Sequence, residues 1–508
     1  MASSTSVFSA ILLVLVAFLV CFVENAEASA VAPGAAPDGV LASWQPSCDV
    51  TGVWECVDAS RQVIGGSPNA EAMRPGQREL VYEPGDVTFR GSYDWFNPKI
   101  GETVYEEMVC AFEIWHASAA DPVARCFDSL DATVFEMHFL DNCTRLVAAL
   151  GEPYGTYTVV GPDAWKQMAS AAAAECLRST EVTSAPEEED IGGASAGVID
   201  TYTGWNPVCD VSGAYACGGR NMRYVDGAPR PEAFTNSVYN VTHAVEGDEK
   251  TFVMSYEWEY DLLDLRVAEV ALCAFEVWSD AVSPSALCFD GIDGSYHELL
   301  FDCDDSCVCT MYQIVSEPFG SHGEIMQGTP ESWVQSPVTG AYACPPIDGN
   351  GTEAAAAAAE AKFDSWRPTC DLSGEWKCEM RKRRGDEVGI QAVDPDRAET
   401  IVFSSEDDLT FSVSYEWVYK SPDGPELIEE TEVCAFKPWS DATSPQAACA
   451  DAIDATTYTL QFLCDEGCGD CRLLELFGEV FGHTDTPDGL FWSWEQGAVA
   501  GAIECTRA

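Results

Sequence analysis

Basic residues are scarce in this sequence. Its 508 residues contain 26 Lys and Arg against 84 Asp and Glu, which leaves a formal net charge of −58. Binding to nucleic acid or to an acidic membrane surface depends on clustered Lys and Arg, so both partners are excluded. Disorder of the whole chain is excluded as well, because 47% hydrophobic residues are enough to bury a core.

Histidine is also scarce, and its positions follow no repeat. The six copies are His116, His138, His243, His297, His322 and His483. None occupies the same position in all three of the repeats described below, so a histidine-based triad or zinc site common to the repeats is excluded. The last residues, 503–508, carry no hydrophobic tail, which argues against a lipid anchor.

An apolar leader opens the sequence. Residues 7–23 contain no charged side chain, and small residues follow at Ala26, Ala28 and Ala30. This pattern is typical of a secretory signal peptide, here residues 1–28. A signal anchor is the alternative, although seventeen residues are at the short limit for crossing a bilayer. We expect a secreted protein, extracellular or at the cell surface, with no stable membrane span after cleavage.

Cysteine is abundant. Without Cys21 of the leader, 22 cysteines remain and divide among three repeats as six, eight and eight. Even numbers in an extracellular protein predict disulfides, although the spacing of Cys464, Cys468 and Cys471 also suits zinc. Three N-glycosylation sequons agree with a secretory route. Their acceptors are Asn142, Asn240 and Asn350.

The sequence repeats itself three times. A Trp-x-Pro-x-Cys-Asp block places Cys48, Cys209 and Cys370 at intervals of 161 residues. Each copy then has a Ser-Tyr-acid-Trp block, a Cys-Ala-Phe block and a Cys-x-Asp block. We predict three homologous domains with limited mutual contact, joined by an acidic flexible linker and an Ala-rich linker. In chain order the boundaries are 40–178 (domain), 179–203 (acidic linker), 204–345 (domain), 346–362 (Ala-rich linker) and 363–508 (domain).

Hydrophobic residues alternate with polar ones in each repeat. Phe411, Val413 and Tyr415 fall on one face of a predicted strand, and Ser412 and Ser414 fall on the other. We therefore predict an all-β fold of three tandem, disulfide-stapled antiparallel barrels or sandwiches.

A short C-terminal helix is predicted in each repeat. Thr329-Pro330 and Thr486-Pro487 supply an N-cap and a proline at the first helical position, and Gly161-Pro162 precedes an Ala-rich equivalent. The basic run 381–384 is predicted to be a solvated loop that pairs with nearby acids. A dibasic proprotein-processing site is the alternative for this run.

The first predicted strand carries a family resemblance. Gly52-Val53-Trp54 and Gly374-Glu375-Trp376 resemble the Gly-x-Trp signature of lipocalins, whereas Gly213-Ala214-Tyr215 departs from it. The resemblance implies a cup-shaped barrel that holds a small apolar ligand.

Comparison of the copies suggests some disulfide pairs. We expect Cys110–Cys126, Cys273–Cys288 and Cys434–Cys449 across a hairpin. The first repeat has only Cys143 where the second has Cys303, Cys307 and Cys309 and the third has Cys464, Cys468 and Cys471. If Cys143 corresponds to Cys309 and Cys471, the two absent cysteines form a local pair. That interpretation predicts Cys303–Cys307 and Cys464–Cys468.

Pairs of aspartates recur at one spacing in all three repeats. They are Asp128/Asp131, Asp290/Asp293 and Asp451/Asp454. Such pairs are candidate calcium ligands, or the acid and base of a glycosidase. An Asx-capped turn is the structural alternative. Calcium is the one cofactor that the sequence suggests.

Three tryptophans recur just after the Cys-Ala-Phe block. Trp115, Trp278 and Trp439 have the opposite parity to the preceding Cys and Phe, so they are expected outside the barrel at a strand end. There they are candidate platforms for a sugar or anchors for a protein. Capping of the barrel is the alternative.

These features favour a secreted, non-enzymatic tandem-repeat binding or extracellular-matrix protein with an acidic, cation-binding surface. Its predicted partners are a carbohydrate or an extracellular protein. The alternatives are a polysaccharide hydrolase that uses the paired aspartates, and a lipocalin-like carrier of a small apolar ligand. Repeated weak binding sites gain avidity, which favours the binding role over three copies of one active site.

Overall fold

The computed structural model describes residues 39–508, with gaps. The residues outside the description are 1–38, 65–66, 71–73, 98–101, 116–120, 129–132, 157–164, 180–204, 226–227, 244–249, 261–264, 291–293, 318–319, 322–332, 335–336, 348–365, 385–396, 404–408, 422–423, 452–455, 466, 480–481, 484–493 and 496–497. The leader, most of both linkers and the Thr-Pro helix starts fall among them. The chain divides into two units, Met1–Ser43 and Trp44–Ala508, and all barrels belong to the second. The one described helix, α2 (Val40–Ser43), belongs to the first.

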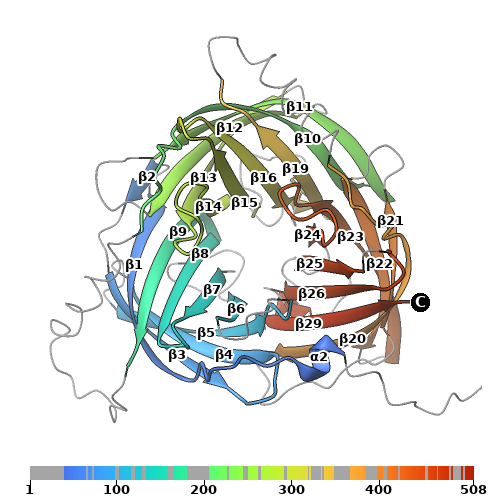
Figure 1. The fold of residues 1–508 in the computed structure, drawn as a ribbon. Coiled ribbons are helices and arrows are strands. Elements are labelled where there is room, and N and C mark those ends of the chain that lie inside the picture. Colours follow the sequence, from blue (N-terminus) through green and yellow to red (C-terminus); the bar gives the residue numbers. More distant parts are fainter. Residues whose placement is uncertain are drawn as a thin grey trace, which may run out of the picture. The chain divides into compact units, whose positions relative to one another are not determined.

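Three closed antiparallel barrels follow one another along the chain, and each strand pairs with the next (Figure 1). Barrel 1 consists of β1 (Gly52–Ile64), β3 (Arg74–Tyr82), β4 (Thr88–Asn97), β5 (Glu102–Phe112), β6 (Val123–Asp128), β7 (Val134–Leu140), β8 (Arg145–Thr156) and β9 (Trp165–Arg178), with β2 (Ser67–Ala70) added to β1. Barrel 2 consists of β10 (Gly213–Val225), β11 (Ala228–Thr242), β12 (Thr251–Tyr260), β13 (Leu265–Phe275), β14 (Ser285–Asp290), β15 (Tyr296–Cys303), β16 (Cys309–Glu317) and β19 (Val338–Cys344).

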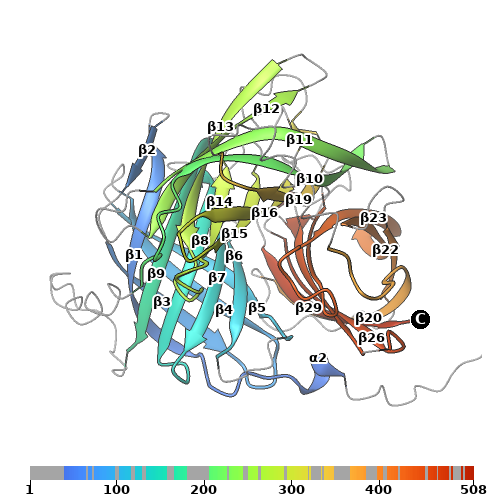
Figure 2. The ribbon, with the colours of Figure 1, turned by 45° about the horizontal axis from the view of Figure 1, so that its top comes forward.

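Barrel 3 repeats this order, and Figure 2 shows its strands curling into a closed cylinder. It consists of β20 (Gly374–Arg384), β21 (Arg397–Phe403), β22 (Thr410–Ser421), β23 (Gly424–Phe436), β24 (Gln446–Ala450), β25 (Thr457–Cys464), β26 (Cys471–Glu479) and β29 (Val499–Arg507). Two-residue strands form separate pairs, β17 (Gly320–Ser321) with β18 (Trp333–Val334) and β27 (Gly482–His483) with β28 (Trp494–Glu495). No helix in the described part of the chain is long and apolar enough to cross a membrane.

The predicted all-β fold is confirmed, and the units are barrels rather than sandwiches. Phe411, Val413 and Tyr415 are buried inside barrel 3, as their alternation predicted. The expected C-terminal helices are not shown. In barrel 1 the Ala-rich segment that was predicted to be helical instead forms strand β9. Its alanines are buried, because small side chains let a neighbouring barrel approach this strand closely; packing therefore outweighs helix propensity here.

The Gly-x-Trp segments begin the first strand of barrels 1 and 3. The backbones of Gly52 (φ +148°) and Gly374 (φ +120°) lie where residues with a side chain are rare. Trp54 is fully buried, and its indole N–H donates to the Val50 carbonyl at 3.2 Å. Tyr215 keeps the same contact in barrel 2, where its hydroxyl donates to the Val211 carbonyl at 2.8 Å. The departure from tryptophan is therefore structurally conservative.

Eleven disulfides join the 22 cysteines of the three barrels. The expected hairpin pairs are confirmed: Cys110–Cys126, Cys273–Cys288 and Cys434–Cys449. A second kind of disulfide joins the first strand of each barrel to the last: Cys56–Cys176, Cys217–Cys344 and Cys378–Cys505. A third joins the segment before the first strand to a later turn: Cys48–Cys143, Cys209–Cys307 and Cys370–Cys468.

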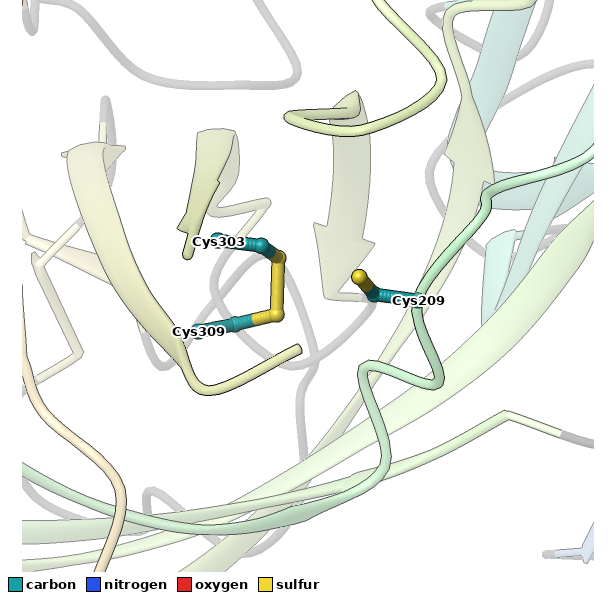
Figure 3. Close-up of side chains that lie close together, drawn as sticks. All are labelled: Cys209, Cys303 and Cys309. Carbon is teal, nitrogen blue, oxygen red and sulfur yellow. A yellow bond between two sulfur atoms is a disulfide. The ribbon is translucent and has the colours of Figure 1, made fainter. Parts of the chain in front are cut away.

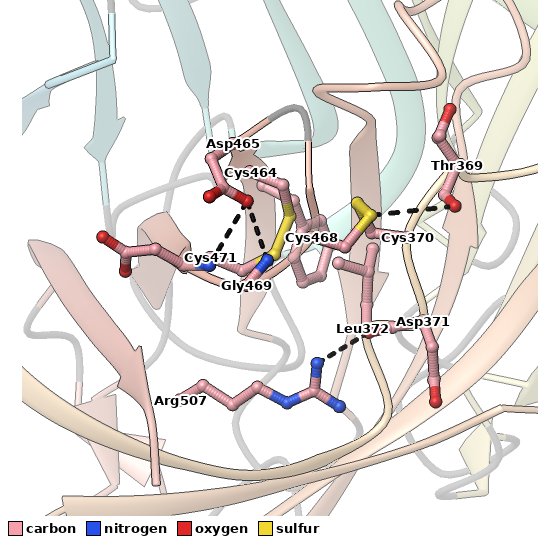
Figure 4. Close-up of a disulfide and its surroundings, with 12 residues drawn as sticks. Thr369, Cys370, Asp371, Leu372, Cys464, Asp465, Cys468, Gly469, Cys471 and Arg507 are labelled. Atoms are coloured by element: carbon pink, nitrogen blue, oxygen red, sulfur yellow. Dashed lines mark hydrogen bonds between the residues drawn. A yellow bond between two sulfur atoms is a disulfide. The ribbon is translucent and has the colours of Figure 1, made fainter.

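The predicted pairs Cys303–Cys307 and Cys464–Cys468 are wrong. Cys303 is bonded to Cys309, and Cys464 to Cys471 (Figure 3, Figure 4). Each of these pairs occupies directly opposed positions of two strands, so the sulfurs face each other.

The turn cysteine between them points elsewhere. Cys143, Cys307 and Cys468 all have a left-handed backbone, with φ between 54° and 59°. Cys143 therefore corresponds to Cys307 and Cys468, not to Cys309 and Cys471. The suggested zinc cluster is likewise wrong, because its sulfurs belong to disulfides and are not thiolates.

The expectation of limited contact between domains is also wrong, because each barrel packs against both others. Strands β8 and β9 contact β13 and β14, strands β16 and β19 contact β23 and β24, and strands β26 and β29 contact β5 and β6. These are equivalent faces of the three copies. Each interface is thus head-to-tail, and the three interfaces together close a cycle.

Small and large residues are matched across these interfaces. A Cβ atom added at Gly151 would overlap the ring of Phe289, and one added at Gly478 would overlap the ring of Phe127. At the third interface the equivalent positions hold Ser316 and Ala450, both buried. Two interfaces thus pair a glycine with a phenylalanine, and the third interface pairs two small residues instead.

The basic run 381–384 lies in strand β20 and is not a solvated loop. Arg383 is 1% exposed, and its guanidinium donates to the Asp86 carboxylate at 2.7 Å and to the Thr88 hydroxyl at 3.2 Å. A buried arginine is tolerated only when a group of opposite charge pairs with it. Arg383 of barrel 3 finds that partner in Asp86 of barrel 1, so the pair joins the two barrels.

The disulfides of barrel 2 should differ in their effect on stability. The Cys209–Cys307 bond spans 98 residues and Cys303–Cys309 only 6. Because a longer closed loop restricts the unfolded chain more, replacing the first pair by serine should cost about 2 kcal/mol more than replacing the second. Urea unfolding of the two double variants measures this difference. Equal losses of stability in the two double variants would contradict the pairing Cys209–Cys307 and Cys303–Cys309. Barrel 1 agrees with this pairing, because it has cysteines only for the long bond, Cys48–Cys143.

The size matching predicts a rescue. Gly151→Ser should destabilise the protein by about 1–3 kcal/mol through overpacking. Combined with Phe289→Ala it recreates the Ser316 and Ala450 pair, so the double variant should lose less stability than the sum of the single ones. Thermal unfolding measures the coupling. Gly478→Ser with Phe289→Ala, which pairs positions from different interfaces, is the control and should be additive.

Candidate functional site

The candidate site is built from the same segment of all three barrels. The chain leaves the barrel wall directly after the Cys-Ala-Phe block, at Glu113, Glu276 and Lys437. Their backbone amides donate to Val123, Ser285 and Gln446 at 2.9, 2.9 and 2.8 Å, which holds the three exits alike. Two residues later come Trp115, Trp278 and Trp439. Their side chains lie outside the barrel interiors, where their parity places them.

These segments meet at one cavity of about 230 Å³, which we call the inter-barrel cavity. All three tryptophans line it, together with charged and polar side chains from every barrel. The lining residues are Glu113, Trp115, Val123, Arg125, Glu136, His138, Glu276, Trp278, Ser285, Glu298, Leu299, Lys437, Trp439, Gln446 and Thr459. Equivalent positions of three tandem copies thus contribute to a single site.

A buried carboxylate connects the barrels at this cavity. Glu298 of barrel 2 accepts hydrogen bonds from Arg125 of barrel 1 at 3.0 Å and pairs closely with Lys437 of barrel 3. Arg125 also lies 3.2 Å from the Glu136 carboxylate and 3.5 Å from that of Glu113. Because all five residues are buried, their charges are weakly screened by solvent.

The environment separates the pKa values of these acids. Burial would raise the pKa of Glu298, but the charges and hydrogen bonds of Lys437 and Arg125 overcome it and hold the value at about 2. Burial raises the pKa of Glu136 to about 7, against the opposing charge of Arg125. Burial, reinforced by Glu136 and Glu298, raises the pKa of Glu276 well above its usual range. The cavity therefore holds a strongly acidic carboxylate beside two that bind protons readily.

The aromatic lining is fixed by neighbouring rings. The Trp278 ring packs edge-on against His138 at 5.9 Å, and the Trp439 ring lies 6.3 Å from Tyr312. The Thr459 hydroxyl is buried and has no hydrogen-bond partner among the described residues. A ligand in the cavity would therefore meet tryptophans, carboxylates and the Thr459 hydroxyl.

The predicted aspartates do not line this cavity. Asp128, Asp290 and Asp451 are buried at the ends of strands β6, β14 and β24, inside their own barrels. In barrel 2 the Tyr256 hydroxyl lies 3.5 Å from the Asp290 carboxylate. Asp131, Asp293 and Asp454 lie outside the described residues. The paired aspartates thus stay a prediction, both as calcium ligands and as catalytic groups.

Two of the predicted glycosylation acceptors can be placed. Asn142 lies in the exposed turn between β7 and β8, and Asn240 is exposed on β11. Asn350 lies outside the described residues. Exposure is required for modification, so the first two positions are suitable acceptors.

Most charged residues of the cavity were missed from the sequence. Glu113, Glu276 and Lys437 could have been found, because each directly follows Cys-Ala-Phe in its repeat. Arg125 had no such signal, because its equivalents in the other copies are Leu287 and Ala448. Glu298 corresponds to Glu136 in barrel 1 and to Thr459 in barrel 3, so that position is acidic in two of the three copies. A single-copy residue such as Arg125 acquires its role only when the three barrels meet.

Comparison with known proteins adds little. No family model matches the chain, and no curated protein is similar to it in sequence. One similar solved structure is the crystal structure of a "putative outer membrane protein" from Bacteroides fragilis, with 13% identity and a TM-score of 0.17. The match covers 58% of this chain and 98% of that one. Likeness at this level assigns no function.

Replacing Glu298 should destabilise the contacts between barrels. Glu298→Gln leaves Arg125 and Lys437 without their shared partner, so we expect a loss of about 3–5 kcal/mol. Because the folded pKa is depressed, the stabilisation from Glu298 is present above about pH 4.5 and is lost as the pH falls towards 2. Urea unfolding of wild type and variant at several pH values measures this.

The exposed Glu375→Gln serves as the matched control and should leave stability unchanged. An equal effect of the two substitutions would contradict the role of Glu298 as the link between barrels.

Proposed function

We propose that this chain is a secreted, non-enzymatic binding or carrier protein that holds a small ligand in the inter-barrel cavity. One observation carries the proposal: three copies of one sequence position supply Trp115, Trp278 and Trp439 to the same cavity. Tryptophan offers a large apolar face together with a polar N–H, which suits it to ligand contacts. Small-molecule sites are concave, with a few placed polar groups, and this cavity has both properties.

The disulfides support an extracellular location. Eleven bonds use all 22 cysteines of the barrels, and disulfides persist in oxidising compartments. The predicted signal peptide agrees with this location, although it lies outside the described residues. Carbohydrate or an extracellular protein as partner, and calcium as cofactor, stay predictions.

The barrel interiors are less suited to an apolar ligand than the lipocalin resemblance implies. The interior of barrel 1 holds the ion pair of Arg78 with Asp58, at 3.2 Å. The interior of barrel 3 contains several buried carboxylates, namely Glu399, Glu430, Glu432, Asp451 and Glu475. Burying these charged side chains against an apolar ligand would cost free energy. This cost favours the inter-barrel cavity over the barrel interiors as the ligand site.

Binding can be tested by titrating the purified protein with three probes: glucose, choline and acetate. At least one should change tryptophan fluorescence saturably and raise the unfolding temperature. Trp115→Ala should weaken that binding by about tenfold, because an aromatic contact of this kind contributes roughly 1–2 kcal/mol.

Two controls make the outcome specific. Tyr105→Ala removes an exposed aromatic residue, 77% accessible and away from the cavity, and should bind as wild type does. Trp115→Phe retains an aromatic ring and should bind with intermediate affinity. The proposal fails if no probe binds, or if Trp115→Ala folds and binds unchanged.

A further inference from the structure

The charges that face the inter-barrel cavity do not balance. Four carboxylates line it, two from barrel 1 and two from barrel 2, against two basic side chains. The acids are Glu113, Glu136, Glu276 and Glu298, and the bases are Arg125 and Lys437. His138 is the remaining titratable group of the lining. With all acids ionised and His138 neutral, the lining therefore carries two excess negative charges.

Both bases are already engaged. Arg125 lies within 3.5 Å of the carboxylates of Glu113, Glu136 and Glu298, and Lys437 pairs with Glu298. Glu276 makes no salt bridge within the described part of the chain. The excess of charge is therefore greatest at Glu276, and Glu136 shares the single charge of Arg125 with Glu113 and Glu298. Protons or a bound cation can compensate the excess at these two acids.

The other lining groups favour an organic cation over a metal ion. Three tryptophans line the cavity. The π face of an indole ring attracts a desolvated ammonium group but is not a ligand for calcium or zinc. The Thr459 hydroxyl, 3% exposed and without a hydrogen-bond partner among the described residues, offers a polar contact to the rest of the ligand. The cavity of about 230 Å³ has room for a small organic molecule such as choline.

We propose that the inter-barrel cavity selects a small organic cation, with the tryptophans around an ammonium group and Glu276 and Glu136 as its counter-charges. This inference rests on the proposed function and names the class of its ligand. The ligand replaces the protons that these acids otherwise hold. Glu113, Glu298, Arg125 and Lys437 keep their mutual pairs, so they serve as the framework of the site.

Binding should weaken in acid. Burial raises the pKa of Glu136 to about 7 and that of Glu276 well above its usual range, so both acids take up protons as the pH falls. His138 also faces the cavity. The affinity for choline should therefore fall between pH 8 and pH 5.

The test compares choline with 3,3-dimethylbutan-1-ol, its uncharged isostere, by calorimetric titration of the whole chain at pH 8. Choline should bind about tenfold more tightly than the isostere. Glu276→Gln should weaken choline binding by about tenfold and leave binding of the isostere unchanged. Glu375→Gln, in an exposed position, is the matched control and should bind both as wild type does.

The outcomes separate the two proposals. Equal affinity for choline and the isostere, or binding of glucose alone, overturns the selection of a cation and leaves the binding function standing. Binding of none of the probes overturns both. Urea unfolding of Glu276→Gln shows whether this variant is folded, and Glu136→Gln provides a second variant that should weaken choline binding in the same direction.

Discussion

The closure of each barrel between its first and last strands is the constraint on which the rest of the structure depends. A disulfide crosses this seam in all three copies, and in barrels 1 and 3 an arginine of the last strand reinforces it. Arg178 donates to the carbonyls of Asp49 and Thr51. Arg507 donates to the carbonyl of Asp371 (Figure 4) and to that of Ser373. A closed sheet has no free edge, and the direction of every side chain, inward or outward, is set by its parity.

Closure determines which residues the barrels present to one another. The last two strands of one barrel meet the fourth and fifth of the eight strands of the next, so alanines and glycines of one face receive larger side chains of the other. Since three copies use the same two faces, the contacts form a cycle and not an open row. The tryptophans that follow the fourth strand of each barrel are thereby brought to one cavity.

The copies have diverged where they meet. The residue after Cys-Ala-Phe is glutamate in two copies and lysine in the third, and Arg125 stands where the other copies have Leu287 and Ala448. A cavity made from three identical segments would repeat one charge three times, at a high electrostatic cost in a buried place. Divergence instead yields a linked set of ion pairs with an acidic remainder.

Many features of the fold could be predicted from the sequence. The three repeats, the alternating strands, the hairpin disulfides and the outward parity of Trp115, Trp278 and Trp439 followed from spacing and period, because these are local properties. The partners of Cys307 and Cys468, the strand conformation of the Ala-rich segment and the burial of Arg383 did not follow. Each depends on a segment that is distant along the chain. The sequence by itself thus determined three disulfide-bonded antiparallel β domains, either barrels or sandwiches, since periodicity and cysteine count are local properties of the chain. Only the tertiary structure decided that they share one cavity and which charges face it, because that requires the register of three interfaces between separate copies.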